Sequence, residues 1–374
     1  MAINIIAQPL PLESVFDDIR FIVLSSTTVD DLKVKAKLEY SRDNVRFTSL
    51  GLMYGEVDGD NFNFNFSNRL QTVVTHDVYD ITQNTLIANT PKSIVYYKVT
   101  FIEQYANNIG LQENFTAYTT SSKQVVNCRI MRLDELNLND FILNSNTSKL
   151  LTNTPKQRIV RPKDLIQLSF LHTQETILEP IILLNGNDLD NVYIGTVEVD
   201  HNRGILLLNV ADVIEDDTRF FTLHFINNED DTILSETLEF IVDTNCYSDT
   251  FQICWLNNRG GFDTYTFVGG KVETKNYSKE MTSKYLSTNF NKSDNDRQVI
   301  SSQTQTTITT YSLWETYKTR KWLSELHASP VTFLINKNGE RIAIDIKNKS
   351  LTIKQDKRLL QVPVEFSFIN EIVK

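Results

Sequence analysis

The segment NFNFNFS, residues Asn61–Ser67, is the strictest alternation of apolar and polar residues in the chain. Successive side chains of a strand point to opposite faces of a sheet, so its three phenylalanines would line one face and its asparagines the other. This pattern favours a strand with one face in a hydrophobic core. A second interpretation is an edge strand, because an exposed segment of this kind is a template for pairing with another chain.

Further β-forming segments lie on both sides of this strand. Valine, isoleucine, phenylalanine, tyrosine and threonine alternate or cluster there between polar breaks. The segments are Ile19–Ser25, Leu32–Tyr40, Val45–Gly55, Ser93–Ala106 and Phe115–Thr120. With the phenylalanine strand they make a set of about seven strands, which is typical of an immunoglobulin or fibronectin type sandwich. We therefore predict an N-terminal β-sandwich domain over residues 1–122.

A polar, turn-rich stretch up to about residue 163 separates this domain from a second β-rich region. Leu133–Leu143 within the stretch is predicted to be a short helix or a turn. Strand-like segments then resume, separated by the Asn-Gly and Asn-Asp pairs of tight turns. They are Leu165–His172, Pro180–Gly186, Val192–Asp200, Gly204–Val213, Arg219–Asn227 and Thr237–Asp243. We predict a linker followed by a second sandwich over residues 123–243.

Residues 244–374 hold all three tryptophans and the strongest helical pattern, so they are predicted to be a separate C-terminal α+β domain. Thr309–Pro330 has helical propensity and ends at a proline. Its apolar residues form two triplets half a turn out of phase. The triplets are Leu313-Trp314-Tyr317 and Trp322-Leu323-Leu326. Such a helix either bends or is buried on two sides, between its own sheet and a neighbouring subunit.

The segment FQICWLNNRGGFDTYTF, Phe251–Phe267, is predicted to be the β-hairpin that opens this domain. Trp255 and the alternating apolar residues before it would lie on one face of the first strand. Asn257–Gly261 supplies turn residues that tolerate positive φ. We expect the aromatic side chains to fill the core and Arg259 to remain exposed at the tip. The alternative is a ligand cage around a glycan. The predicted fold class is mainly β, with two immunoglobulin/fibronectin-like antiparallel β-sandwich domains followed by a C-terminal α+β domain with one main helix.

The composition disfavours several classes of protein. The net charge is −10 and no basic stripe is present, so no direct binding of nucleic acid is predicted. Cys128, Cys246 and Cys254 have no CxxC spacing, so neither a disulfide framework nor a zinc site is expected. The N-terminal segment has no basic start and no sustained apolar run, so no signal peptide is predicted. No stretch approaches the ~18 apolar residues of a membrane span.

The sequence contains none of the common catalytic or cofactor-binding motifs. A Walker loop, GxGxxG, GxSxG and HExxH are all absent, so we predict that the chain is not an enzyme and has no cofactor. The five histidines are expected to be ordinary strand and helix residues. Acidic turns leave calcium binding open, because short loops rich in Asp, Asn and Glu supply oxygen ligands. These turns are Gly55–Asn61, Asn185–Asn191, Glu215–Asp217 and Asn227–Thr232.

Several segments of the sequence resemble virion proteins of tailed phages that infect Bacteroidetes, of the crAss-like and flavobacterial kinds. The segments are Phe62–Asp80, Val95–Gly110, Ser121–Met131 and Phe251–Phe267. The resemblance implies a structural component of the tail, baseplate or head–tail connector, assembled in the host cytoplasm and located in the virion. It also implies a ring-like homo-oligomer in contact with other tail proteins. No catalytic or binding residue carries over from it.

Two other functions stay open, a carbohydrate-binding or host-adhesion module and a β-rich hydrolase whose carboxylates meet in three dimensions. If the chain is an assembly subunit, its exposed apolar residues in the third domain should lie at the subunit contact. The predicted interface residues are Arg259, Leu313, Trp314, Tyr317, Trp322 and Leu326.

Overall fold

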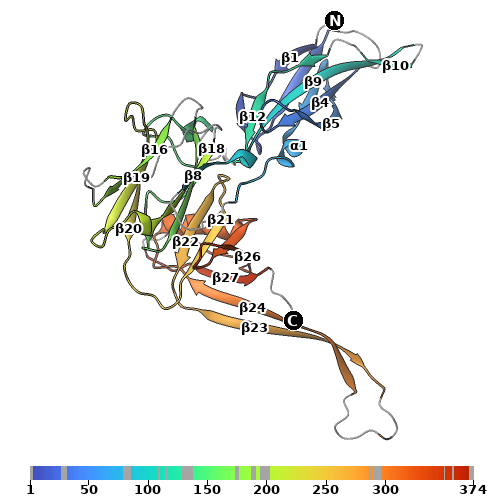
Figure 1. The fold of residues 1–374 in the computed structure, drawn as a ribbon. Helices are drawn as coiled ribbons and strands as arrows, with labels where there is room; N and C mark the ends of the chain where they lie inside the picture. The colour runs from blue at the N-terminus through green and yellow to red at the C-terminus, as the bar shows by residue number, and fades with distance from the viewer. Residues whose placement is uncertain are drawn as a thin grey trace.

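A computed structural model shows three β-rich domains in sequence and a long two-stranded ribbon that leaves the third (Figure 1). The structure describes residues 3–26, 32–78, 86–107, 110–113, 117–128, 138–172, 177–186, 191–193, 203–285, 289, 296–348, 350–355 and 358–369. Strands dominate and helices are few, so the predicted mainly β class is confirmed. The predicted segments Phe115–Thr120, Leu133–Leu143 and Val192–Asp200 lie partly outside the described residues.

The first domain is an immunoglobulin-like sandwich of two sheets. One sheet has the order β1-β3-β7-β6, and the other has the order β2-β12-β9-β4-β5. The strands of the first sheet are β1 (Ile3–Ala7), β3 (Arg20–Ser25), β7 (Asn61–Asn65) and β6 (Glu56–Asp58). Those of the second are β2 (Leu12–Ser14), β12 (Lys123–Val126), β9 (Ile94–Asn107), β4 (Lys33–Ser41) and β5 (Thr48–Tyr54), with β10 (Gly110–Glu113) and β11 (Tyr118–Thr119) beside β9. A short helix, α1 (Ser67–Gln71), and a 3-10 turn, η1 (Pro91–Ser93), complete the domain.

The phenylalanine strand lies inside this sandwich. β7 pairs with β3 on one side and β6 on the other, so it is not an edge strand. Phe62, Phe64 and Phe66 are at most 6% exposed and pack in the core of the domain. Each such burial contributes about 1.5–3 kcal/mol. The interpretation as a core strand is confirmed, and the edge-strand alternative is wrong.

The first domain extends beyond the predicted boundary at residue 122. Strand β12 pairs antiparallel with β9 and parallel with β2, so it closes the second sheet of this sandwich. The predicted linker also contains strands of the second domain. β13 (Ile142–Leu143) pairs with β15 (Leu165–His172), and β14 (Gln157–Val160) pairs with β20 (Leu238–Val242). These strands are short and flanked by polar residues, so they lack the apolar runs that indicated strands elsewhere.

The second domain is a sandwich of the same kind. Its sheets have the orders β13-β15-β18-β8 and β14-β20-β19-β16-β17. The remaining strands and the 3-10 turns are β16 (Leu178–Leu184), β17 (Asn191–Tyr193), β18 (Arg203–Asn209), β19 (Phe220–Asn227), η3 (Leu138–Phe141) and η4 (Val210–Asp212). Strand β8 (Leu86–Asn89) belongs in sequence to the first domain, between β7 and β9, but it pairs with β18 of the second. The first domain thus completes a sheet of its neighbour.

The third domain is built on one antiparallel sheet with the order β22-β21-β25-β26-β27-β24-β23. The strands are β21 (Phe251–Leu256), β22 (Phe262–Phe267), β23 (Val272–Ser283), β24 (Arg297–Tyr311), β25 (Thr332–Ile335), β26 (Arg341–Ile346) and β27 (Pro363–Phe368). Helix α2 (Tyr317–Ala328) packs on the sheet through Trp322, Leu323 and Leu326, which are at most 2% exposed.

Helix α2 is shorter than the predicted helix. Residues up to Tyr311 continue β24, because threonine and isoleucine favour strands. The helix begins after Thr316, whose side chain caps its first turn. Leu313 and Trp314 therefore precede the helix, and the two triplets do not share one helical surface. Neither a bend nor burial of one helix on two sides is needed to explain them.

The predicted opening hairpin is confirmed. β21 and β22 pair from Phe251 opposite Phe267 to Leu256 opposite Phe262. Ile253 and Trp255 are fully buried in the core of the domain. The turn has its positive φ at Gly260 (82°).

Candidate assembly interface

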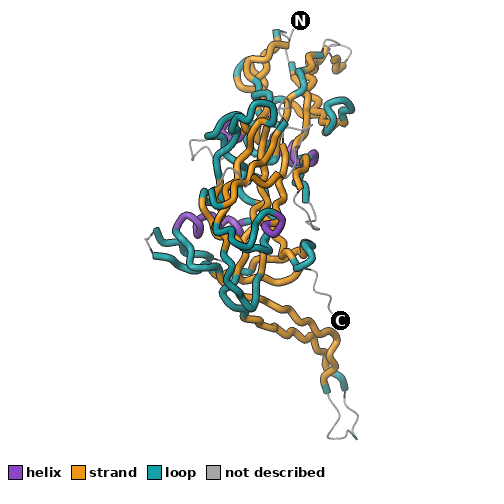
Figure 2. Tube along the Cα trace, turned by 60° about the vertical axis from the view of Figure 1, so that its left-hand side comes forward, coloured by secondary structure: helices purple, strands orange, loops and turns teal. Residues whose placement is uncertain are grey.

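The ribbon of β23 and β24 projects away from the third domain (Figures 1 and 2). Its register runs from Val272 opposite Thr309 to Ser283 opposite Arg297. Thr307–Tyr311 of β24 also pairs with β27. Among the described strands, the rest of the ribbon has no other neighbour. We call β23 together with Arg297–Thr306 the arm.

Solvent surrounds the arm. Every residue of β23 is exposed, and because side chains alternate between the two faces, both faces are open to water. Tyr277 is 69% exposed, Met281 50% and Ile300 63%. A two-stranded hairpin is marginally stable by itself in water. The arm therefore has little packing of its own to stabilise it.

One face of the arm combines positive charge with apolar surface. Alternation places Lys275, Tyr277, Lys279 and Met281 on the same face, and Val299 lies opposite Met281. Lys275 Nζ lies 3.3 Å from an oxygen of Glu273. Lys279 has no acidic partner among the described residues. Such a surface is typical of protein interfaces in which opposite charges speed association and buried apolar area slows dissociation.

The structure divides the six predicted interface residues into two groups. Trp314 is 61% exposed, and Leu313 and Tyr317 are half-buried, so these three remain candidates for a subunit contact. Trp322 and Leu326 are buried in the core of their own domain, so they cannot form that contact.

Arg259 is buried rather than exposed, which corrects the prediction for the hairpin tip. It is 5% exposed, since the tip inserts at the junction of the domains. Its Nε donates a hydrogen bond to Oδ1 of Asn153 (3.1 Å), and its guanidinium lies 5.2 Å from the ring centroid of Phe141. Arg259 thus attaches the third domain to the second within one chain. The sequence of a turn that tolerates positive φ does not show whether its tip is exposed to solvent or packed against another part of the protein.

Arg203 joins all three domains. It lies on β18 of the second sandwich and is 2% exposed. Its Nη1 donates to the carbonyl oxygen of Asn127 in the first domain (2.7 Å), and its Nη2 donates to that of Gly260 in the third (2.5 Å). Beside it, the ring of His76 from the first domain packs edge-on against Phe262. Burial and the charge of Arg203 lower the pKa of His76.

A buried carboxylate, Asp263 on β22, links the second and third domains. Its Oδ2 accepts a hydrogen bond from Nε1 of Trp322 (2.7 Å), and its Oδ1 accepts one from Oγ1 of Thr152 (2.7 Å). The guanidinium of Arg158 lies 5.3 Å from the ring centroid of Trp322, and its Nη1 donates to the carbonyl oxygen of Thr264. Burial raises the pKa of Asp263, although these hydrogen bonds oppose the shift.

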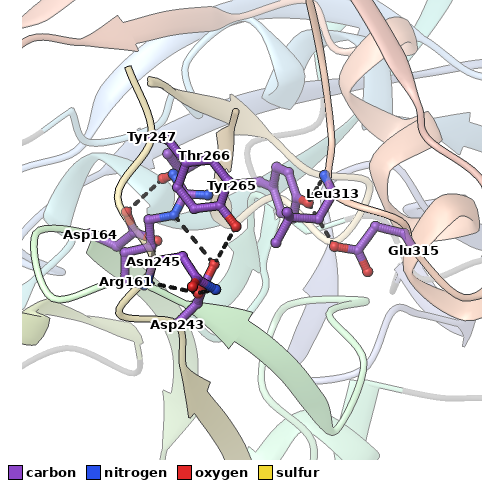
Figure 3. Close-up of polar contacts among 9 residues, drawn as sticks. All are labelled: Arg161, Asp164, Asp243, Asn245, Tyr247, Tyr265, Thr266, Leu313 and Glu315. Atoms are coloured by element: carbon purple, nitrogen blue, oxygen red, sulfur yellow. Dashed lines mark hydrogen bonds and ion pairs between the residues drawn. The ribbon is translucent and has the colours of Figure 1, made fainter. Parts of the chain in front are cut away.

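Further polar contacts join the same two domains (Figure 3). Oγ1 of Thr266 donates to Oδ1 of Asp164 (2.7 Å). Within the third domain, beside this contact, the hydroxyl of Tyr265 donates to Oε1 of Glu315 (2.7 Å). Burial raises the pKa of Asp164 and of Glu315. Thr266, Thr152 and Arg158 thus each hydrogen-bond across the junction, which favours one orientation of the two domains.

The described residues hold no group of three or more His, Cys, Asp or Glu side chains that could bind a metal ion. Of the four acidic turns, Asn185–Asn191 lies partly outside those residues. A shallow depression of about 510 Å³ lies at the base of the arm. Its lining is polar and comprises Asn276, Gln305, Thr307, Lys347, Asn348, Ser350 and Glu365. Burial lowers the pKa of His224 and of His327. Among the described residues, neither imidazole is hydrogen-bonded to a carboxylate or to a nucleophilic side chain.

No family model and no curated protein matches the chain. Among solved structures, the chain is similar to the native conformation of E. coli alpha-2-macroglobulin at 9% identity and a TM-score of 0.21. That match covers 83% of this chain and 21% of the other, so the chain spans about a fifth of that protein. The titin I-band fragment I67–I69 matches at 8% identity and a TM-score of 0.19, covering 83% of this chain and 94% of the fragment. Likenesses this weak carry no argument about function.

Sequence reasoning missed the arm. β24 is rich in the strand-forming residues threonine, isoleucine and valine, but they do not alternate strictly with polar residues, and its last residues fall in the segment predicted to be a helix. The described helices include none long and apolar enough to cross a membrane.

Proposed function

We propose that the chain is a structural subunit of a tailed-phage virion, in a ring or hub of the tail, baseplate or connector, and that the arm makes its contacts with other subunits. The role is structural rather than catalytic. The observation that carries the proposal is the arm, a ribbon exposed on both faces with a row of apolar side chains. Exposed apolar surface and open strand edges are typical of association surfaces.

The rigid body behind the arm supports the same role. Strand β8 completes a sheet of the second domain, and Arg203 bridges three domains. A cluster that includes Ile205, Cys254 and Phe262 fills the junction of the second and third domains with apolar side chains. A subunit fixed in this way transmits a defined orientation to its neighbours, which a closed ring requires.

The test compares the full chain with a variant that lacks most of the arm. Thr274 pairs with Thr307, so an Asn-Gly turn in place of residues 275–306 closes the ribbon at its base. We expect the full chain to form a defined oligomer by light scattering and negative-stain microscopy. The shortened variant should be monomeric and should still unfold cooperatively, with a near-UV circular dichroism spectrum that shows packed aromatic side chains.

A full chain that stays monomeric at high micromolar concentration contradicts the proposal. So does a shortened variant that assembles normally. Binding of a monomeric full chain to a glycan array would favour the host-adhesion alternative instead.

Trp314→Ala in the full chain tests the second candidate contact, the surface around Trp314. The expected result is weakened assembly with unchanged monomer stability.

A further inference from the structure

The formal charge is divided unequally among the three domains. Residues 129–243 contain nine Lys/Arg and 20 Asp/Glu, a net charge of −11. Residues 244–374 contain 18 Lys/Arg and 13 Asp/Glu, a net charge of +5. The remaining residues, 1–128, have a net charge of −4. Because charges of both signs are interspersed locally, this difference in net charge between the domains becomes evident only when the domain boundaries are known.

The turn between β19 and β20 concentrates the negative charge of the second domain beside apolar surface. Glu229, Asp230 and Asp231 are all exposed there, and Ile233 next to them is 41% exposed. The turn between β18 and β19 is also acidic, with Asp212, Glu215, Asp216 and Asp217 all exposed. This turn also contains the exposed Arg219, and none of its large apolar side chains is strongly exposed.

The arm has the opposite character. Its face with Lys275 and Lys279 carries these two positive charges against the one negative charge of Glu273, which pairs with Lys275, and Tyr277 and Met281 lie between and beside the lysines. From Thr274 to Ser283 the strand spans roughly 30 Å, at about 3.3 Å per residue, which is enough to reach across a neighbouring sandwich. A basic and apolar face on one domain therefore matches an acidic and apolar turn on another domain of the same chain.

From this match we infer that the arm of one copy binds the β19–β20 turn of the second sandwich in the next copy. The inference rests on the proposed function and specifies the contact within it. The two surfaces differ, so the contact is heterologous, and repeating it builds a ring if the rotation closes and a filament if it does not. Opposite charges would steer the encounter, and apolar contact would slow dissociation.

A charge-swap series on the full chain tests the inference. One variant carries Lys275→Glu and Lys279→Glu, and a second carries Glu229→Lys and Asp230→Lys. Each should weaken self-association at least tenfold in sedimentation velocity experiments. The variant with all four substitutions should recover most of the lost affinity, because each side again meets the opposite charge. A matched control, Asp216→Lys with Asp217→Lys, changes the net charge equally and should have a much smaller effect.

The outcomes separate this inference from the proposed function. If arm truncation abolishes assembly but the charge variants assemble normally, the arm is an assembly element and the inferred contact is wrong. If the combined variant shows no recovery, or if the control weakens assembly as much as the Glu229 and Asp230 variant, the β19–β20 turn is not the binding site. A full chain without any self-association overturns both proposals.

Discussion

The indole Nε1 of Trp322 donates a hydrogen bond of 2.7 Å to Oδ2 of Asp263, deep inside the third domain. Both residues are at most 2% exposed. This bond connects α2 to β22, the edge strand that packs against the second sandwich. A carboxyl group so far from water needs hydrogen-bond partners in either protonation state, so the position of the helix and the junction of the domains depend on one another.

Replacing Trp322 with phenylalanine keeps most of the apolar volume but removes the donor to Asp263. The buried carboxylate then loses one of its partners, and we expect the free energy of unfolding to fall by about 1–3 kcal/mol. Urea denaturation followed by circular dichroism measures the change. Trp314→Phe is the control, because Trp314 is 61% exposed and its loss should change monomer stability by less than about 0.5 kcal/mol. Equal effects at the two positions would show that the bond contributes nothing.

Gly260 is expected to tolerate no side chain. A Cβ atom built there would lie 2.0 Å from the carbonyl oxygen of Asn127, a backbone atom of the first domain. Gly260→Ala should therefore displace the hairpin tip from the junction, in addition to the cost of about 1 kcal/mol for positive φ. We expect a much lower melting temperature and faster proteolysis between the first domain and the rest of the chain.

Gly270 supplies the matched control for this position. Its φ of 78° is close to the 82° of Gly260, yet a Cβ there would meet nothing within 4 Å. Gly270→Ala should cost only the backbone strain. If the two variants lose the same stability, the close approach to Asn127 does not restrict position 260.

Alternation with a period of two residues predicted the long strands well, because burial of one face of a sheet requires apolar residues at every second position. Asn61–Asn65 and the hairpin of Phe251 and Phe267 are examples in which alternation identified both the strand and its buried face. Short strands such as Ile142–Leu143 leave no such trace, since two residues cannot show a period. The predicted linker therefore contains strands, β13 and β14, that the pattern does not indicate.

The candidate interface was harder to predict than the fold. Trp322 and Trp314 lie eight residues apart, and no local pattern distinguishes the buried indole from the exposed one. The difference depends on which residues begin α2 after the Thr316 cap. Strand β8 shows a second limit, because its partner in the second sandwich is more than a hundred residues away in the sequence.

The carboxyl group of Glu325 should make the stability of the molecule depend on pH. Glu325 lies on α2, and its Oε1 accepts a hydrogen bond from Nδ2 of Asn153 (2.6 Å) across the domain junction. Burial and the charge of Asp263 raise its pKa from 4.5 to about 7. The folded state therefore binds a proton more tightly than the unfolded state, so the stabilisation is complete below pH 4.5 and is lost as the pH rises through 7.

Glu325→Gln removes this titration while keeping the shape of the side chain. From about pH 5.5 to about pH 8, the wild type should lose about 2 kcal/mol of unfolding free energy more than the variant does. Other buried carboxyl groups, such as Asp164, are present in both proteins, so the comparison reports Glu325 together with its charge coupling to Asp263. Urea denaturation at several pH values measures the difference, with the exposed Glu215→Gln as the control that should follow the wild type. Parallel pH profiles for the wild type and Glu325→Gln would mean that the Glu325 carboxyl is ionised throughout this range, despite its place in the junction.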